Sequence, residues 1–71
     1  MKYTLDVETY TKVRKGKEGD HFEDLKSYTT EEIDGASQAI RVAREIQIQG
    51  YRNGRITSII RRDRKGRGRA L

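Results

Sequence analysis

The hydrophobic pattern at the start of the chain has a period of two residues. Between residues 2 and 13, apolar or β-branched side chains such as Leu5 and Val7 alternate with polar ones. This alternation predicts a strand with one buried face. Residues 14–20 hold two glycines and five charges, which predicts an exposed turn, and a weaker pattern over residues 21–28 predicts a second strand that pairs back as a hairpin.

The spacing changes to that of a helix in the middle of the chain. Apolar residues recur there every three or four positions, which predicts a helix over residues 38–49 that ends at Gly50. Two helix starts are open. Thr29 has the form of a capping box with the acidic residues after it, whereas a start at Ser37 leaves the preceding residues in a strand.

A third strand is expected after the helix. Asn53 and Gly54 are a pair typical of a tight turn, and the alternation over residues 55–62 is that of a strand. The order β-β-α-β predicts the α+β class, with a small antiparallel or mixed three-stranded sheet covered by one helix. We expect residues 1–62 to form this single domain and residues 63–71 to form a flexible, arginine-rich basic tail.

The composition allows only a small core. Of the 71 residues, 32% are hydrophobic and 38% are charged. Without cysteine, and with one histidine, the chain is expected to hold no metal and no cofactor. The absence of cysteine and of a long apolar run predicts a cytoplasmic protein with no membrane partner. The residues expected to supply the core are Tyr3, Leu5, Val7, Phe22, Leu25, Ile33, Ile40, Ala43, Ile46, Ile56, Ile59 and Ile60.

The net charge of +5 is divided unevenly along the chain. Residues 1–37 carry a net charge of −3 and residues 38–71 carry +8, and nine of the ten basic residues in the second half are arginines. Arginine binds phosphate with two hydrogen bonds and stacks on flat groups, which lysine does less well. The candidate binding residues are Arg41, Arg44, Arg52, Arg55, Arg61, Arg62, Arg64, Lys65, Arg67 and Arg69.

The arginine-rich ending predicts a partner that is nucleic acid, DNA or RNA, or a nucleoprotein complex. Its six basic side chains would neutralise about six phosphates, which predicts a log-log salt slope of roughly −5 on duplex DNA. Glycines between the arginines keep the backbone supple, as in RNA-binding arginine-glycine segments. Three alternatives stay open: a solvated end with no partner, surface ion pairs such as Arg41 with Glu45, and a protein partner or second copy that meets the acidic first half of the chain.

No catalytic residue is expected. His21 stands among three carboxylates, those of Asp20, Glu23 and Asp24. Such a cluster is common in exposed charged loops, and no second histidine, serine triad spacing or phosphate-binding loop accompanies it. The sequence therefore predicts a binding protein rather than an enzyme.

Two segments of the chain resemble small phage proteins, among them some anti-CRISPR inhibitors. They are Gly35–Arg44, with the sequence GASQAIRVAR, and Asn53–Ile59, with the sequence NGRITSI. Those proteins join a short strand, a small-residue cap, an alanine-rich helix and a returning strand. The resemblance implies a non-enzymatic inhibitor that docks on a CRISPR effector complex and blocks its nucleic-acid binding or activity.

The same resemblance transfers no functional residue. Many of those inhibitors are acidic, and the basic half of this chain departs from that habit, which argues against simple mimicry of DNA. The opening Met1–Thr4 also resembles that of some antitoxin domains, which implies a ribosome-associated or toxin-antitoxin accessory module as a third hypothesis.

Overall fold

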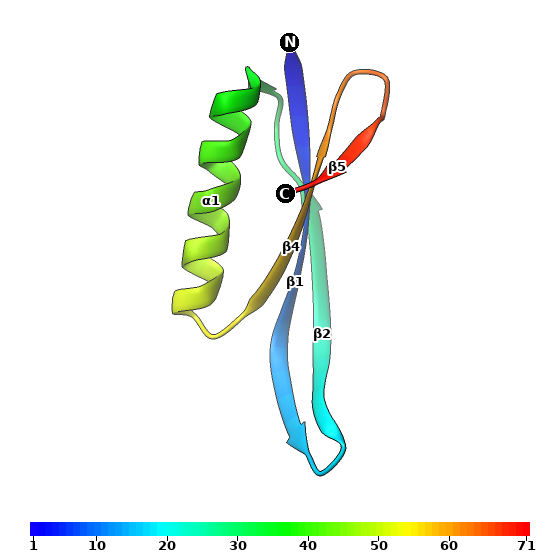
Figure 1. Ribbon diagram of the computed structural model, residues 1–71, viewed down its shortest axis with the longest axis vertical. Helices are drawn as coiled ribbons and strands as arrows, with labels where there is room; N and C mark the ends of the chain where they lie inside the picture. The colour runs from blue at the N-terminus through cyan, green and yellow to red at the C-terminus, as the bar shows by residue number, and fades with distance from the viewer.

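The computed structural model describes residues 1–71, apart from the side chain of Val13. The chain forms a twisted sheet with one helix lying along one side of it, as Figure 1 shows. The elements in chain order are β1 (Lys2–Gly16), β2 (Gly19–Thr29), β3 (Ile33–Asp34), α1 (Ala36–Arg52), β4 (Ile56–Arg62) and β5 (Gly68–Ala70).

All strand pairings are antiparallel. The strand order is β2-β1-β4-β5, and β3 pairs with the first residues of β1. The α+β class, the antiparallel sheet and the single helix are therefore confirmed. The sheet has five strands instead of the predicted three. The two additional strands are two and three residues long, too short to leave a periodic pattern in the sequence.

The β1–β2 hairpin is longer than the sequence predicts. Its register runs from Asp6 opposite Thr29 to Gly16 opposite Gly19, so that only two residues remain in the turn. Most of the expected loop over residues 14–20 is therefore strand. The hairpin extends past the end of the helix (Figure 1), and the described molecule measures 46 × 22 × 16 Å.

The helix begins at Ala36, close to the later of the two predicted starts, but the N-cap is Gly35, and the predicted cap Ser37 lies inside the first turn. Both threonines of the expected capping box have other partners. The Thr29 hydroxyl donates to the Asp6 carboxylate, and the Thr30 hydroxyl accepts from the Leu5 amide at 3.0 Å. The segment before the helix is therefore held against β1. Gly35 then turns the chain with a φ of 91°, which a residue with a side chain rarely adopts.

The predicted end of the helix at Gly50 is wrong. The helix continues to Arg52, and the Asn53 side-chain amide donates to the Gln49 carbonyl at 2.9 Å. Gly50 lies inside the last turns, where a Cβ would come within 2.4 Å of the Thr57 hydroxyl on β4. The glycine is there because the helix and β4 approach closely at this point.

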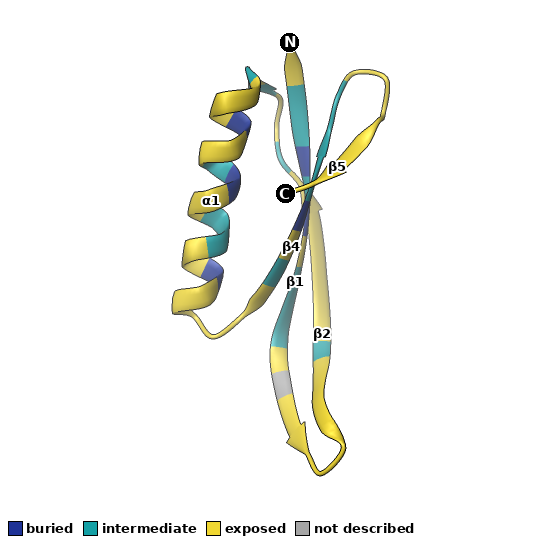
Figure 2. Ribbon diagram, viewed as in Figure 1, coloured by how far each residue is buried: buried dark blue, intermediate teal, exposed yellow. Residues whose placement is uncertain are grey.

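The core lies between the inner side of α1 and the middle of β1 and β4, as the buried segments in Figure 2 show. Half-buried Tyr3, Ile33, Val42 and Ile46 pack around it. Four of the predicted core residues are exposed: Ile40 on α1, and Phe22, Leu25 and Ile56 on parts of the sheet that the single helix does not cover. The buried hydrophobic residues are Leu5, Val7, Ala39, Ala43 and Ile59.

The predicted flexible tail is not confirmed. Residues Gly68–Ala70 form β5, which pairs with the end of β4, and the Leu71 amide donates to the Ile59 carbonyl at 3.0 Å. The arginine-rich ending is thus a second hairpin on the edge of the sheet. Backbone hydrogen bonds build it, and these are available to charged sequences as well as to apolar ones.

Candidate nucleic-acid interface

The β4–β5 hairpin brings together six of the ten predicted binding residues. Across it, Arg61 lies opposite Arg69 and Arg62 opposite Gly68. The connecting loop carries the remaining three cations, Arg64, Lys65 and Arg67, all of which are exposed. We call this segment, residues 61–69, the arginine hairpin.

The loop of the arginine hairpin is ordered by its one acidic residue. The Asp63 carboxylate accepts from the backbone amides of Lys65 and Arg67, at 2.9 and 3.0 Å. The Asp63 amide donates in turn to the Arg67 carbonyl at 3.1 Å, and Gly66 turns the chain with a φ of 80°. With the carboxylate directed at the backbone, the three loop cations are left facing solvent.

Arg62 has a structural role. Its guanidinium forms an ion pair with the Asp6 carboxylate on β1 and also donates to the Gly66 carbonyl at 3.0 Å. The hydrogen bond from the Arg62 guanidinium to the Asp6 carboxylate, together with one from the Thr29 hydroxyl, holds the pKa of Asp6 below its ordinary value. Gly68 leaves room for the guanidinium, since a Cβ there would lie 3.2 Å from the Arg62 Nη1. The positive charge of Arg62, unlike that of the other predicted binding residues in the hairpin, is already paired with a carboxylate, that of Asp6.

Arg61 and Arg69 face each other with the same charge. The Arg61 guanidinium lies over the ring of Tyr3, 4.6 Å from its centroid, and is half-buried. Arg69 is exposed beside it on β5. Among the described side chains, no carboxylate forms an ion pair with either of them. Like charges in directly opposed positions destabilise a sheet, so this pair raises the positive potential of the hairpin at some expense of stability.

The other four predicted residues lie elsewhere. Arg41 and Arg44 are on α1, and Arg52 and Arg55 flank the turn between α1 and β4. That turn and the loop of the arginine hairpin are at opposite ends of β4, roughly 20 Å apart by the rise of a seven-residue strand. The ten residues therefore do not form one continuous patch.

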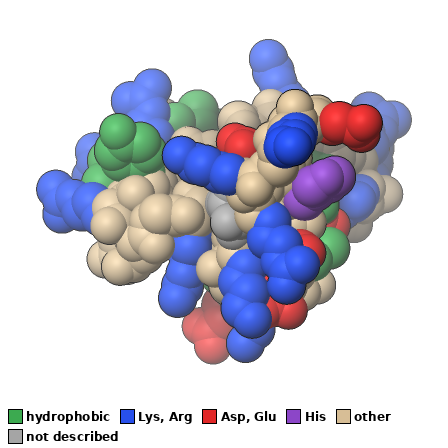
Figure 3. All heavy atoms as spheres, turned by 90° about the horizontal axis from the view of Figure 1, so that it is seen from below, with side chains coloured by type: hydrophobic (Ala, Val, Ile, Leu, Met, Phe, Trp, Pro, Cys, Tyr) green, Lys and Arg blue, Asp and Glu red, His purple; other side chains and the backbone are tan. Residues whose placement is uncertain are grey.

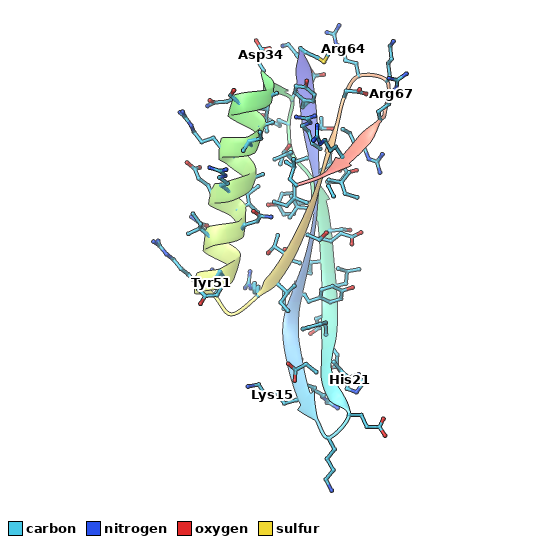
Figure 4. The ribbon with its side chains drawn as sticks, in the orientation of Figure 1. Lys15, His21, Asp34, Tyr51, Arg64 and Arg67 are labelled. Atoms are coloured by element: carbon cyan, nitrogen blue, oxygen red, sulfur yellow. The ribbon has the colours of Figure 1, made fainter. Side chains whose placement is uncertain are left out.

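The end of the molecule that carries the α1–β4 turn is mixed in charge. In Figure 3, which looks at this end, basic side chains are spread over the surface with acidic side chains and the histidine among them. A shallow hollow at the end of the helix is lined by Arg44, Gln47, Ile48, Tyr51 and Arg52. Figure 4 shows Tyr51 at this end and Arg64 and Arg67 at the other. Six of the predicted binding residues are thus close together in the arginine hairpin, whereas the other four are spread along α1 and the turn after it.

Lys2 is a basic neighbour that sequence reasoning missed. With Asp34 and Arg64 it lines a hollow beside the loop of the arginine hairpin. It arrives there because the register between β1 and β4 sets Thr4 opposite Arg62. Only that pairing, which joins residues far apart in the chain, would have revealed it.

Two of the carboxylates around His21 form ion pairs with basic residues of β1. Glu23 pairs with Arg14 at 3.6 Å and Asp24 with Lys12 at 3.3 Å, on the two strands of the exposed hairpin. No three His, Cys, Asp or Glu side chains in the part of the chain described here are grouped to hold a metal ion. The one described helix is neither long nor apolar enough to cross a membrane.

Comparisons with protein-family models, with curated proteins and with solved structures each found no match. The candidate site therefore rests on the geometry of this chain.

Proposed function

We propose that this protein binds nucleic acid, free or within a nucleoprotein complex, through the arginine hairpin. It does so in the cytoplasm, without a cofactor and without catalysing a reaction. The sheet positions the hairpin, and the five cations that form no ion pair with a described carboxylate contact phosphates: Arg61, Arg64, Lys65, Arg67 and Arg69.

The observation that carries this proposal is the opposition of Arg61 and Arg69 beside an ordered cationic loop. A solvated basic tail needs no fixed backbone, and its charges repel each other into extended forms. Here the loop is held by Asp63 and the two strand arginines are held by the sheet register. Phosphates placed across the hairpin relieve the repulsion, and the loss of entropy on binding is small because the backbone is already ordered.

The direct test removes the three loop cations and measures binding. The variant carries Arg64→Gln, Lys65→Gln and Arg67→Gln, and its affinity for labelled duplex DNA, single-stranded DNA and RNA is followed by fluorescence anisotropy at about 50 and 200 mM salt. On duplex DNA, five phosphate contacts predict a log-log salt slope of roughly −4 to −5 for the wild type, and the loss of three reduces its magnitude by roughly 3. The polymer that the wild-type protein binds most tightly is then the preferred ligand.

A matched control removes the same charge from the opposite end of the molecule. The end of the β1–β2 hairpin carries three cations on the last residues of β1 and in the turn, and Figure 4 places Lys15 there, far from Arg64 and Arg67. A variant with Arg14→Gln, Lys15→Gln and Lys17→Gln should keep the wild-type slope. Equal losses in both variants would show that net charge alone drives binding. Wild-type protein that fails to bind any of the three polymers at low salt would leave a protein target, as in the inhibitor hypothesis, as the remaining function.

A further inference from the structure

Arg61 stands on the face of the sheet that α1 covers, at the border of the core. It lies directly opposite Leu5 on β1 and Arg69 on β5, and directly opposed residues of neighbouring strands share a face. Leu5 is fully buried in the core with Ala39 and Ala43 of the helix. Arg61 is accordingly half-buried, whereas Arg69 and the three loop cations are exposed. Of the five cations proposed to contact phosphates, Arg61 is therefore the recessed one.

The Arg61 guanidinium is held by an aromatic ring. It lies over Tyr3, 4.6 Å from the ring centroid, and Tyr3 itself packs against the core. The Tyr3 hydroxyl donates to the Met1 sulfur at 3.1 Å, which helps to fix the ring. To the described atoms the guanidinium donates no hydrogen bond, yet the one buried side-chain polar atom there without a partner is the Thr57 hydroxyl oxygen. The guanidinium nitrogens of Arg61 therefore reach solvent.

This arrangement has the components of a stacking site for an unpaired base. Proteins that bind single strands combine a basic surface for phosphates with flat groups on which bases stack, and arginine planes serve for this as aromatic rings do. One face of the Arg61 plane rests on Tyr3, so its orientation is set before a ligand binds. Its other face is available for a base and its N–H edge for a phosphate. In the described chain, the one guanidinium that lies over an aromatic ring is thus a cation of the arginine hairpin.

We propose that the polymer bound by the arginine hairpin is single-stranded, and that one of its bases stacks on the Arg61 guanidinium over Tyr3. This inference rests on the proposed function and names its class of ligand. The phosphates next to that base lie on Arg69 and on the loop cations, which project from the loop in Figure 4. In a duplex, each base is already stacked and paired within the helix, so the protein meets phosphates and the exposed cations suffice to bind them. The recessed plane of Arg61 adds affinity only where a base can leave the stack.

A strand without bases tests the stacking. Fluorescence anisotropy of the full chain at about 50 mM salt compares labelled ligands of equal length: a single strand of DNA or RNA, the DNA strand with an abasic sugar at every position, and the DNA duplex. The abasic strand keeps the phosphates and lacks the bases. Removal of one stacked base weakens binding roughly 5- to 150-fold, so the wild type should bind the complete single strand at least about fivefold more tightly than the abasic one. It should also prefer the single strand to the duplex, although the duplex has the higher charge density.

Arg61→Lys keeps the charge and removes the plane. It should weaken binding to the complete single strand at least about fivefold, and it should leave the affinities for the abasic strand and the duplex within about twofold of the wild type. The salt slope should not change, because the number of neutralised phosphates stays the same. Arg69→Lys is the matched control, since Arg69 is the directly opposed arginine and no ring lies under it among the described side chains. This variant should stay within about twofold of the wild type on all ligands.

Two changes at Tyr3 examine the ring under the guanidinium. Tyr3→Phe keeps the ring and should bind the single strand as the wild type does. Tyr3→Leu removes the ring and keeps an apolar side chain at the border of the core, so it should reproduce the selective loss of Arg61→Lys. Circular dichroism confirms that each variant is folded, and Arg61→Lys carries the test by itself if Tyr3→Leu is not.

The outcomes separate this inference from the proposed function. Equal affinities for the complete and the abasic strand, tighter binding of the duplex, or equal losses in Arg61→Lys and Arg69→Lys would overturn the stacking. Each of these results would still leave the arginine hairpin as a phosphate-binding site. A wild-type protein that binds none of the ligands at low salt would instead overturn the proposed function, and this inference with it.

Discussion

Replacement of Gly50 by alanine should destabilise the protein, although the same change stabilises most helices. Gly50 lies inside α1, two residues before its end. In a helix interior, alanine is favoured over glycine by up to about 1 kcal/mol, because glycine loses more backbone freedom on folding. Here a Cβ would come within 2.4 Å of the Thr57 hydroxyl oxygen, closer than nonbonded atoms approach.

The size of the effect follows from that overlap. Forcing an additional methyl group into a packed site costs about 1–3 kcal/mol, and the gain in helix propensity offsets part of it. We expect Gly50→Ala to lower the free energy of unfolding by about 1 kcal/mol, a fall in Tm of about 4–8 °C for a domain of this size. Thr57→Ala removes the obstructing oxygen, which is buried and has no hydrogen-bond partner among the described atoms.

A double-mutant cycle separates the contact from the propensity. In the Thr57→Ala background, Gly50→Ala should stabilise the protein by up to about 1 kcal/mol, so the two changes are coupled by about 2 kcal/mol. Urea denaturation of the four proteins gives the coupling, with Gln49→Ala, at an exposed neighbouring position, as a control expected to change stability by less than about 0.5 kcal/mol. Gly50→Ala that is equally stabilising in both backgrounds would refute the close approach of α1 and β4.

Two further predictions concern the acidic partners of the arginine hairpin. The hydrogen bond from Arg62, and then that from Thr29, lowers the pKa of Asp6 below 3.8. The contribution of ionised Asp6 to stability is therefore complete above about pH 4 and is lost as the pH falls through the pKa that Asp6 has in the folded protein. Asp6→Asn should be less stable than the wild type at neutral pH, and in urea titrations below about pH 4 its stability should fall less steeply. Asp63→Ala removes the acceptor of two loop amides and should speed hydrogen exchange at Lys65 and Arg67 by about fivefold, for about 1 kcal/mol of lost local stability, with no change at core amides as the control.

The elements that could be predicted from the sequence are those with a buried face. Alternation identified β1 because Leu5 and Val7 pack against the helix, and the helical stripe identified α1 because Ala39 and Ala43 face the sheet. The Asn53–Gly54 turn is also confirmed, with Gly54 at a φ of 69°. In each case the signal is local in the chain: the spacing of apolar residues within one element, or a residue pair that suits the backbone of one turn.

The errors have non-local causes. Gly50 is an ordinary helix stop in the sequence, and only the approach of Thr57 explains a glycine inside the helix. β5 has no apolar alternation, so charge alone suggested a tail. Within the candidate site, Arg62 is indistinguishable from its neighbours until its partner Asp6, which lies 56 residues earlier, is brought to it by the pairing of β1 with β4.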